Sequence, residues 1–119
     1  MGVKLTDFGT KNMTAKDMKT KSLTVIVDGS FVKDYDSKTD DGREYVKHVP
    51  VLKVHYQNDK ITEYKDFVLN RENRERISRT GIIDLDSLIG ASIEIEKVFV
   101  NFKNNEVAAL RIGKITLPN

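Results

Sequence analysis

Apolar and polar residues alternate along five segments of the chain, and a period of two is typical of a half-buried β-strand. These segments are Leu23–Val32, Tyr45–Tyr56, Ile61–Leu69, Ser92–Phe102 and Val107–Leu117. A segment of a different kind, Arg71–Arg79, lies between the third and the fourth. It follows Asn70, a good N-cap, and it places Glu72 four residues before Arg76. This spacing predicts one short helix.

Three strands, one helix and two further strands follow one another in the order of the OB-fold. We therefore predict a mainly β domain, a five-stranded, partly open Greek-key barrel with one short helix between strands three and four. An OB-fold commonly binds single-stranded nucleic acid or oligosaccharide, but a fold alone does not define a function. The predicted core consists of Leu23, Val25, Val27, Leu52, Val54, Leu69, Ile77, Leu88, Ile93, Ile95, Leu110 and Ile112.

Turn residues and composition predict how these elements are connected. Gly29 indicates a bulge, and Asp34–Glu44 is interpreted as a long, mobile acidic loop beside the binding face, without a metal site. Asn58-Asp59 and Asn104-Asn105 mark hairpin turns, and the sequence leaves the register of the first of these hairpins open. Residues 1–21 are predicted to form a polar N-terminal extension, and residues 22–119 the OB-fold domain.

Length and composition limit the class of protein. The chain has 119 residues, enough for one domain, and its 20 basic and 18 acidic residues give a net charge of +2. This is weakly basic for a nucleic-acid-binding protein, so such a function needs the cations gathered on one face. There is no cysteine, no apolar stretch long enough to span a membrane and no apolar segment typical of a signal peptide. We expect a cytoplasmic protein.

Signatures of enzymes and metal sites are absent from the sequence. Asp34-Tyr35-Asp36-Ser37-Lys38 begins like a calcium-binding loop, but Lys38 stands where an oxygen ligand is needed. The glycines are scattered, so no phosphate-binding loop is predicted. His48 and His55 lack a third ligand nearby, and Asp84 or Asp86 is explained by capping of a short turn. We predict a non-catalytic protein without metal or cofactor.

A series of short motifs carries a resemblance to a known family. The series begins with Met13–Met18 and Leu23–Val27, continues with Phe67-Val68-Leu69-Asn70-x-x-Asn73 and Leu88-Ile89-Gly90, and ends with Ile93-x-Ile95, Val100-x-Phe102 and Val107-x-x-Leu110-Arg111-Ile112. It resembles a family of small phage and prophage OB-fold proteins that are presumed to bind single-stranded DNA beside replication and recombination functions. The chain departs from the family pattern in the acidic stretch Asp34–Glu44 and in Leu88, where the family has tryptophan.

Binding of a single strand without sequence preference needs cations that contact phosphates and aromatic rings on which bases stack. In OB-folds these groups lie on strands two and three and on the flanking loops. The predicted nucleic-acid-binding residues are Phe31, Lys33, Tyr45, Lys47, Lys53, His55, Tyr64, Lys65, Lys97 and Phe99. Asn101 and Lys103 could extend this set along the last hairpin.

Structural explanations compete with several of these assignments. Phe67, Phe99 and Phe102 are interpreted first as core residues, and Arg71–Arg79 as a solvated helix face. The favoured function is a non-catalytic single-stranded DNA-binding accessory protein of a phage or archaeal virus, with RNA as a possible ligand and replication proteins as possible partners. The alternative is an OB-fold module that contacts a replication partner or a coat subunit. A small hydrolase or nuclease that uses the acidic loop is least favoured. A homodimer is possible, and no membrane partner is expected.

Overall fold

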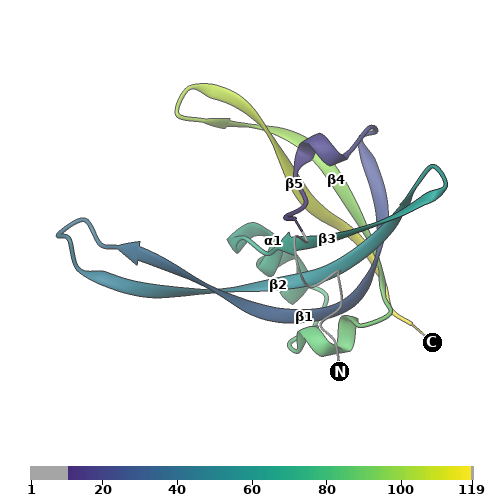
Figure 1. Ribbon diagram of the computed structural model, residues 1–119, viewed down its shortest axis with the longest axis horizontal. Helices are drawn as coiled ribbons and strands as arrows, with labels where there is room; N and C mark the ends of the chain where they lie inside the picture. The colour runs from purple at the N-terminus through teal and green to yellow at the C-terminus, as the bar shows by residue number, and fades with distance from the viewer. Residues whose placement is uncertain (1–10, 119) are drawn as a thin grey trace.

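Residues 11–118 are described in the computed structural model, and they form one curled antiparallel sheet of five strands with one α-helix (Figure 1). The strands are β1 (Ser22–Lys38), β2 (Glu44–Asn58), β3 (Ile61–Val68), β4 (Ser92–Phe102) and β5 (Asn105–Thr116). Helix α1 (Arg71–Ser78) lies between β3 and β4, as predicted, and two short 3₁₀ turns are η2 (Ala15–Asp17) and η3 (Leu85–Leu88). The strand order in the sheet is β3-β2-β1-β4-β5.

Strand β1 joins the two halves of the sheet because it has two partners. Its first residues, from Ser22 to Ile26, pair with β4, and its longer remainder pairs with β2. The register of the β1–β2 pairing shifts between Val27 and Gly29, which confirms the predicted bulge. A bulge increases the local twist of a strand, and it therefore helps β1 to bend from one partner to the other.

The prediction of a long acidic loop over Asp34–Glu44 is wrong. Strand β1 continues to Lys38 and β2 begins at Glu44, so the connection contains only residues 39–43. Polar residues on both sides of a ribbon imitate the composition of a loop, and this concealed the strands. The connection itself is ordered by short hydrogen bonds: the amide of Thr39 donates to the carbonyl of Arg43 (2.8 Å) and the amide of Gly42 to that of Thr39 (3.0 Å).

Two-residue turns set the register of the other hairpins. Asn58 pairs with Ile61, so β2 and β3 are joined by a turn in which Asp59 has a φ of 58°. Phe102 pairs with Asn105, which places the last turn at residues 103–104, one residue earlier than predicted. The positive φ values in these turns match the twist of the flanking strands.

The hydrophobic core lies inside the curl of the sheet and largely confirms the prediction. Ten of the twelve predicted core residues are buried, while Leu23 and Leu110 are partly buried and pack against the others. Phe67 is also a core residue, as expected. The prediction that Phe99 and Phe102 are buried is wrong, since they are 63% and 60% exposed. They lie toward the tip of the β4–β5 hairpin, which extends beyond the core (Figure 1).

The described part of the predicted extension contributes two side chains to the core. Met13 and Met18 are buried there. The amide of Met13 donates to the carbonyl of Asp66 (2.8 Å), and the amide of Asp66 donates to the carbonyl of Lys11 (3.0 Å). Residues 11–13 therefore cover part of the outer edge of β3. Residues 1–10 lie outside the described part of the chain.

Helix α1 covers part of the other edge of the sheet. Its buried Asn73 accepts a hydrogen bond from the amide of Ile112 (2.9 Å) and donates one to the carbonyl of Leu110 (3.1 Å). The guanidinium of Arg76 donates to the carbonyl of Ile112 (3.1 Å). Because Asn70 caps the helix through the amide of Asn73 (2.9 Å), the Asn-x-x-Asn motif has a structural function.

Candidate nucleic-acid interface

The long β1–β2 hairpin has two different surfaces, because neighbouring side chains of a strand alternate between its faces and cross-strand partners share a face. Tyr35 lies opposite Lys47, and Ser37 lies opposite Tyr45, so these residues share one face. This face continues along β2 and onto β3. We name its cations and rings the lysine–tyrosine face, and the buried Val49 and Val51 lie among them on the same side of β2. Its members are Phe31, Lys33, Tyr35, Tyr45, Lys47, Lys53, His55 and Tyr64.

The opposite face of the same hairpin is acidic. Asp34 lies opposite His48, Asp36 opposite Val46, and Lys38 opposite Glu44. All three carboxylates of the paired segments 31–38 and 44–51 therefore lie on one side of the ribbon, which we name the acidic face. Lys33 and Lys47 lie on the other side. The hairpin thus separates charge across its thickness, although its net charge is close to zero.

Along β1, rings and a cation alternate on the lysine–tyrosine face, in the order Phe31, Lys33, Tyr35. The ammonium group of Lys33 is 5.6 Å from the centre of the Tyr35 ring, and that of Lys53 is 5.5 Å from the centre of the Phe31 ring. The side chains of Tyr45 and Tyr64 are about half exposed, at 47% and 49%. Exposed rings can stack on bases, and ammonium groups beside them can contact the phosphates of the same strand.

One carboxylate lies among these lysines at the β3 side of the face. Asp66 pairs with Lys53 across β2 and β3, and it is only 7% exposed. Its Oδ1 atom has no hydrogen-bond partner within the described residues. Burial raises the pKa of Asp66 above its ordinary value, and the positive charges of Lys53 and Lys33 partly oppose this shift.

Both histidines contact aspartates, but they project from opposite faces. His55 Nδ1 lies 2.8 Å from the carboxylate of Asp28, beside the bulge, and its ring centre is 5.7 Å from that of Tyr64. His48 Nδ1 lies 2.6 Å from Asp34 on the acidic face. The two imidazoles therefore cannot share a ligand. Within residues 11–118, no group of three histidine or acidic side chains is placed to hold a metal ion.

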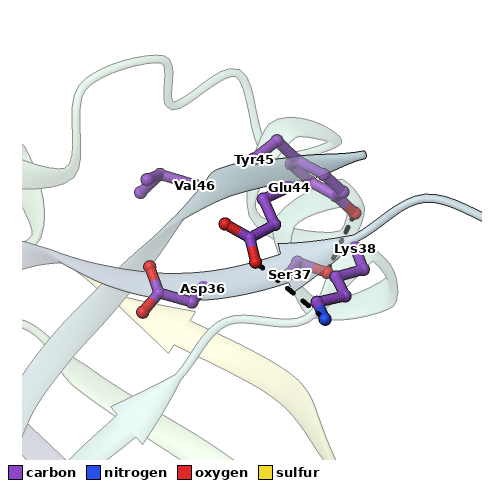
Figure 2. A pocket seen from close by; sticks show the side chains of 6 residues that line it. All are labelled: Asp36, Ser37, Lys38, Glu44, Tyr45 and Val46. Atoms are coloured by element: carbon purple, nitrogen blue, oxygen red, sulfur yellow. Dashed lines mark hydrogen bonds and ion pairs between the residues drawn. The ribbon is translucent and has the colours of Figure 1, made fainter. Parts of the chain in front are cut away.

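The tip of the hairpin holds an open pocket of about 540 Å³, lined by Asp36, Ser37, Lys38, Glu44, Tyr45 and Val46. Figure 2 shows the two contacts that organise it. The hydroxyl groups of Ser37 and Tyr45 lie 3.1 Å apart, and the ammonium group of Lys38 lies 3.9 Å from Glu44. The hydrogen bond restrains the ring of Tyr45 at the end of the lysine–tyrosine face.

Seven of the ten predicted site residues share the lysine–tyrosine face, and Lys65, Lys97 and Phe99 lie elsewhere. Lys65 lies opposite the core residue Val54, and its ammonium group is 3.4 Å from Asp17 in a mostly buried pair. Lys97 donates to the backbone carbonyl of Met18 (3.0 Å). Phe99 is on the β4–β5 hairpin. The N-terminal segment therefore engages two of the predicted phosphate contacts.

Tyr35 is the member of the face that the prediction missed. Phe31, Lys33 and Tyr35 alternate with Val32 and Asp34, so the period of two was present in the sequence. Assigning residues from Asp34 onward to a loop hid it. A strand extended by four residues would have placed Tyr35 beside Lys33.

No protein-family model matches the chain, and no curated protein or solved structure matches it significantly. The described residues include no helix both long and apolar enough to cross a membrane.

Proposed function

We propose that the protein binds single-stranded DNA across the lysine–tyrosine face and does so without catalysis. The separation of charge across the β1–β2 hairpin carries this proposal. Lys33 and Lys47 share a face with Tyr35 and Tyr45, whereas the carboxylates of the same segments lie behind them. A phosphate backbone is attracted to the first surface and repelled by the second. The hairpin therefore favours one path for a strand despite a net charge of only +2.

The arrangement of the sheet supports an OB-fold, which is part of the same proposal. Five antiparallel strands in the order β3-β2-β1-β4-β5, with one helix between β3 and β4, are the features expected of that fold. OB-folds bind oligonucleotides on strands two and three, between the loops that join strands one and two and strands four and five. Five of the eight residues of the lysine–tyrosine face lie on these two strands, and Phe31, Lys33 and Tyr35 lie on the neighbouring β1.

The resemblance to small phage and prophage proteins supports an accessory role in replication or recombination, in a phage or an archaeal virus. We propose single-stranded DNA as the ligand and leave RNA as an outcome of the experiment, because a 2′-hydroxyl contact would distinguish them. Duplex DNA should bind more weakly, since its bases are already stacked and hidden from the tyrosines.

The test is a titration of fluorescein-labelled dT, U and duplex oligomers at two salt concentrations. Lys47→Ala should weaken dT binding and lower the slope of log Kd against log salt by about 0.7, the value for one phosphate contact on a single strand. Lys38→Ala is the matched control, because it removes the same charge from the acidic face of the same hairpin.

The two variants distinguish an effect of the lysine–tyrosine face on binding from an effect of the net charge. Equal losses for Lys47→Ala and Lys38→Ala would mean that only the net charge matters, and the site would lie elsewhere. Failure of the wild-type protein to bind any oligomer at low salt would contradict the proposed function.

A further inference from the structure

The outer edge of β5 is covered by α1 at Leu110 and Ile112. Asn73 occupies the place of a neighbouring strand at Leu110 and Ile112, since it bonds to the carbonyl of one and the amide of the other. Alternation along the strand directs both backbone groups of Ala108 to this same edge. Within residues 11–118, no hydrogen bond covers these groups. An open strand edge of this kind is a template for a further strand.

A second segment with unpaired backbone groups lines the same groove as this edge. Asn12 lies between Lys11 and Met13, whose backbone groups bond to Asp66, so its own amide and carbonyl point away from β3. Asn12 and Ala108 both line one groove with a volume of about 420 Å³. Within residues 11–118 the groove therefore offers unpaired main-chain groups from two segments, β5 and residues 11–13.

The lining of the groove indicates the chemistry of its occupant. Although 32% of the chain is charged, every lining residue in the described part of the chain is uncharged. They are Asn12, Met13, Thr14, Ala15, Tyr35, Phe67, Val68, Asn70, Asn73, Ala108, Ala109 and Leu110. A nucleic-acid strand would find no cation for its phosphates here, whereas an uncharged extended peptide needs none.

We propose that this groove receives an extended, uncharged segment of a partner protein, which adds to the sheet as a strand between β5 and residues 11–13. Main-chain hydrogen bonds to Ala108 and Asn12 supply the affinity, as in other complexes formed by strand addition. The small side chains of Ala108 and Ala109 leave room for small apolar side chains of the partner. Among the described residues the groove shares Tyr35 with the lysine–tyrosine face, but strand addition uses main-chain groups of other residues and does not depend on the proposed DNA binding.

The test uses ¹⁵N-labelled full-length protein and a library of blocked hexapeptides that alternate threonine with alanine, valine or leucine. Binding peptides should shift the amide signals of Ala108 and Asn12. N-methylation of alternate peptide residues removes the donors on one edge and should weaken binding at least tenfold, with the protein unchanged. Ala108→Pro should cause a similar loss, because proline lacks the edge amide, while Ala108→Ser keeps that amide and should bind normally.

Three results would overturn the inference. One is the absence of binding by every library member at millimolar concentration. Another is equal affinity of the N-methylated and unmodified peptides, which would exclude main-chain pairing. The third is a dT oligomer that shifts the Ala108 and Asn12 signals while the peptides do not, which would assign the groove to nucleic acid.

Discussion

Asn73 is the residue through which α1 and β5 are joined. It is 1% exposed, and both ends of its side-chain amide bond to the backbone of β5. An amide can satisfy a carbonyl and an N–H of one strand together, which a carboxylate or an aliphatic side chain cannot do. The second asparagine of the Asn-x-x-Asn motif therefore has a reason in the fold that is independent of any ligand.

Replacing Asn73 with alanine should lower the free energy of unfolding by about 2–4 kcal/mol, because two buried backbone groups of β5 lose their partners. Urea unfolding measures this change. Arg74→Ala, on the exposed side of the same helix, is the control and should change stability by no more than about 0.5 kcal/mol. Similar losses in the two variants would show that helix propensity dominates and that the bridge to β5 is weak.

Asp66 makes stability depend on pH. Burial raises its pKa, so the folded state favours the neutral carboxyl. The stability due to this preference is complete below the ordinary pKa of aspartate and is lost as the pH rises through the folded-state value. Asp66→Asn should therefore raise the free energy of unfolding by about 1 kcal/mol at pH 7, within the cost of a buried unsatisfied polar group, and change it little at pH 3.

Urea unfolding of wild type and Asp66→Asn at the two pH values tests this expectation. A gain of the same size at both would attribute the effect to packing rather than to ionisation. The variant also removes a negative charge from the lysine–tyrosine face, so its affinity for a dT oligomer should increase if the proposed function holds.

In the β1–β2 hairpin, side chains alternate between two faces, and this alternation produces two surfaces of opposite charge. A two-stranded ribbon that leaves the body of the domain has no core on either side, so both of its faces can carry polar residues (Figure 1). Where the same strands continue over the core, Leu52 and Val54 of β2 are buried on the core side, and Val49 and Val51 are buried on the other side. The two faces of the ribbon can therefore carry different charges without loss of core packing.

Tyr45 and Val46 provide a sharp comparison within this hairpin. They are neighbours on β2, are 47% and 49% exposed, and lie on opposite faces. Tyr45→Ala should weaken binding of a dT oligomer by roughly fivefold or more at every salt concentration, since base stacking on a ring is worth about 1–3 kcal/mol. Val46→Ala should leave affinity unchanged. Fluorescence anisotropy measures both, and a loss on Val46→Ala equal to that on Tyr45→Ala would contradict a one-sided site.

At the scale of the whole molecule, the two edges of the sheet are covered by different segments. Residues 11–13 partly cover β3, and α1 partly covers β5, so the edges do not pair with each other within the described residues. The segment from Lys11 to Met18 also binds the side chains of Lys65 and Lys97 through Asp17 and the carbonyl of Met18. Part of the predicted extension thus completes the core and leaves one groove open.

The local pattern of the chain was sufficient to predict the order of the elements, the helix and most of the core residues. Alternation identifies strands such as Ser92–Phe102, whose predicted bounds agree with β4, because one face of each is buried. Gly29 and Asn70 act through their own backbone or nearest neighbours, so a bulge and a cap could be read from them directly. The same alternation brought seven of the ten proposed site residues onto one face.

Other features depend on contacts between residues far apart in the chain. The bonds of Asn73 to β5 span almost forty residues, and those of Lys65 and Lys97 reach the N-terminal segment, so no local pattern indicates them. Phe99 is exposed because the core does not extend as far as its position on the hairpin, and alternation along a strand does not show how far a core extends. The outer part of the β1–β2 hairpin resembled a loop in the sequence, because a strand without a buried face has no apolar side that would indicate it.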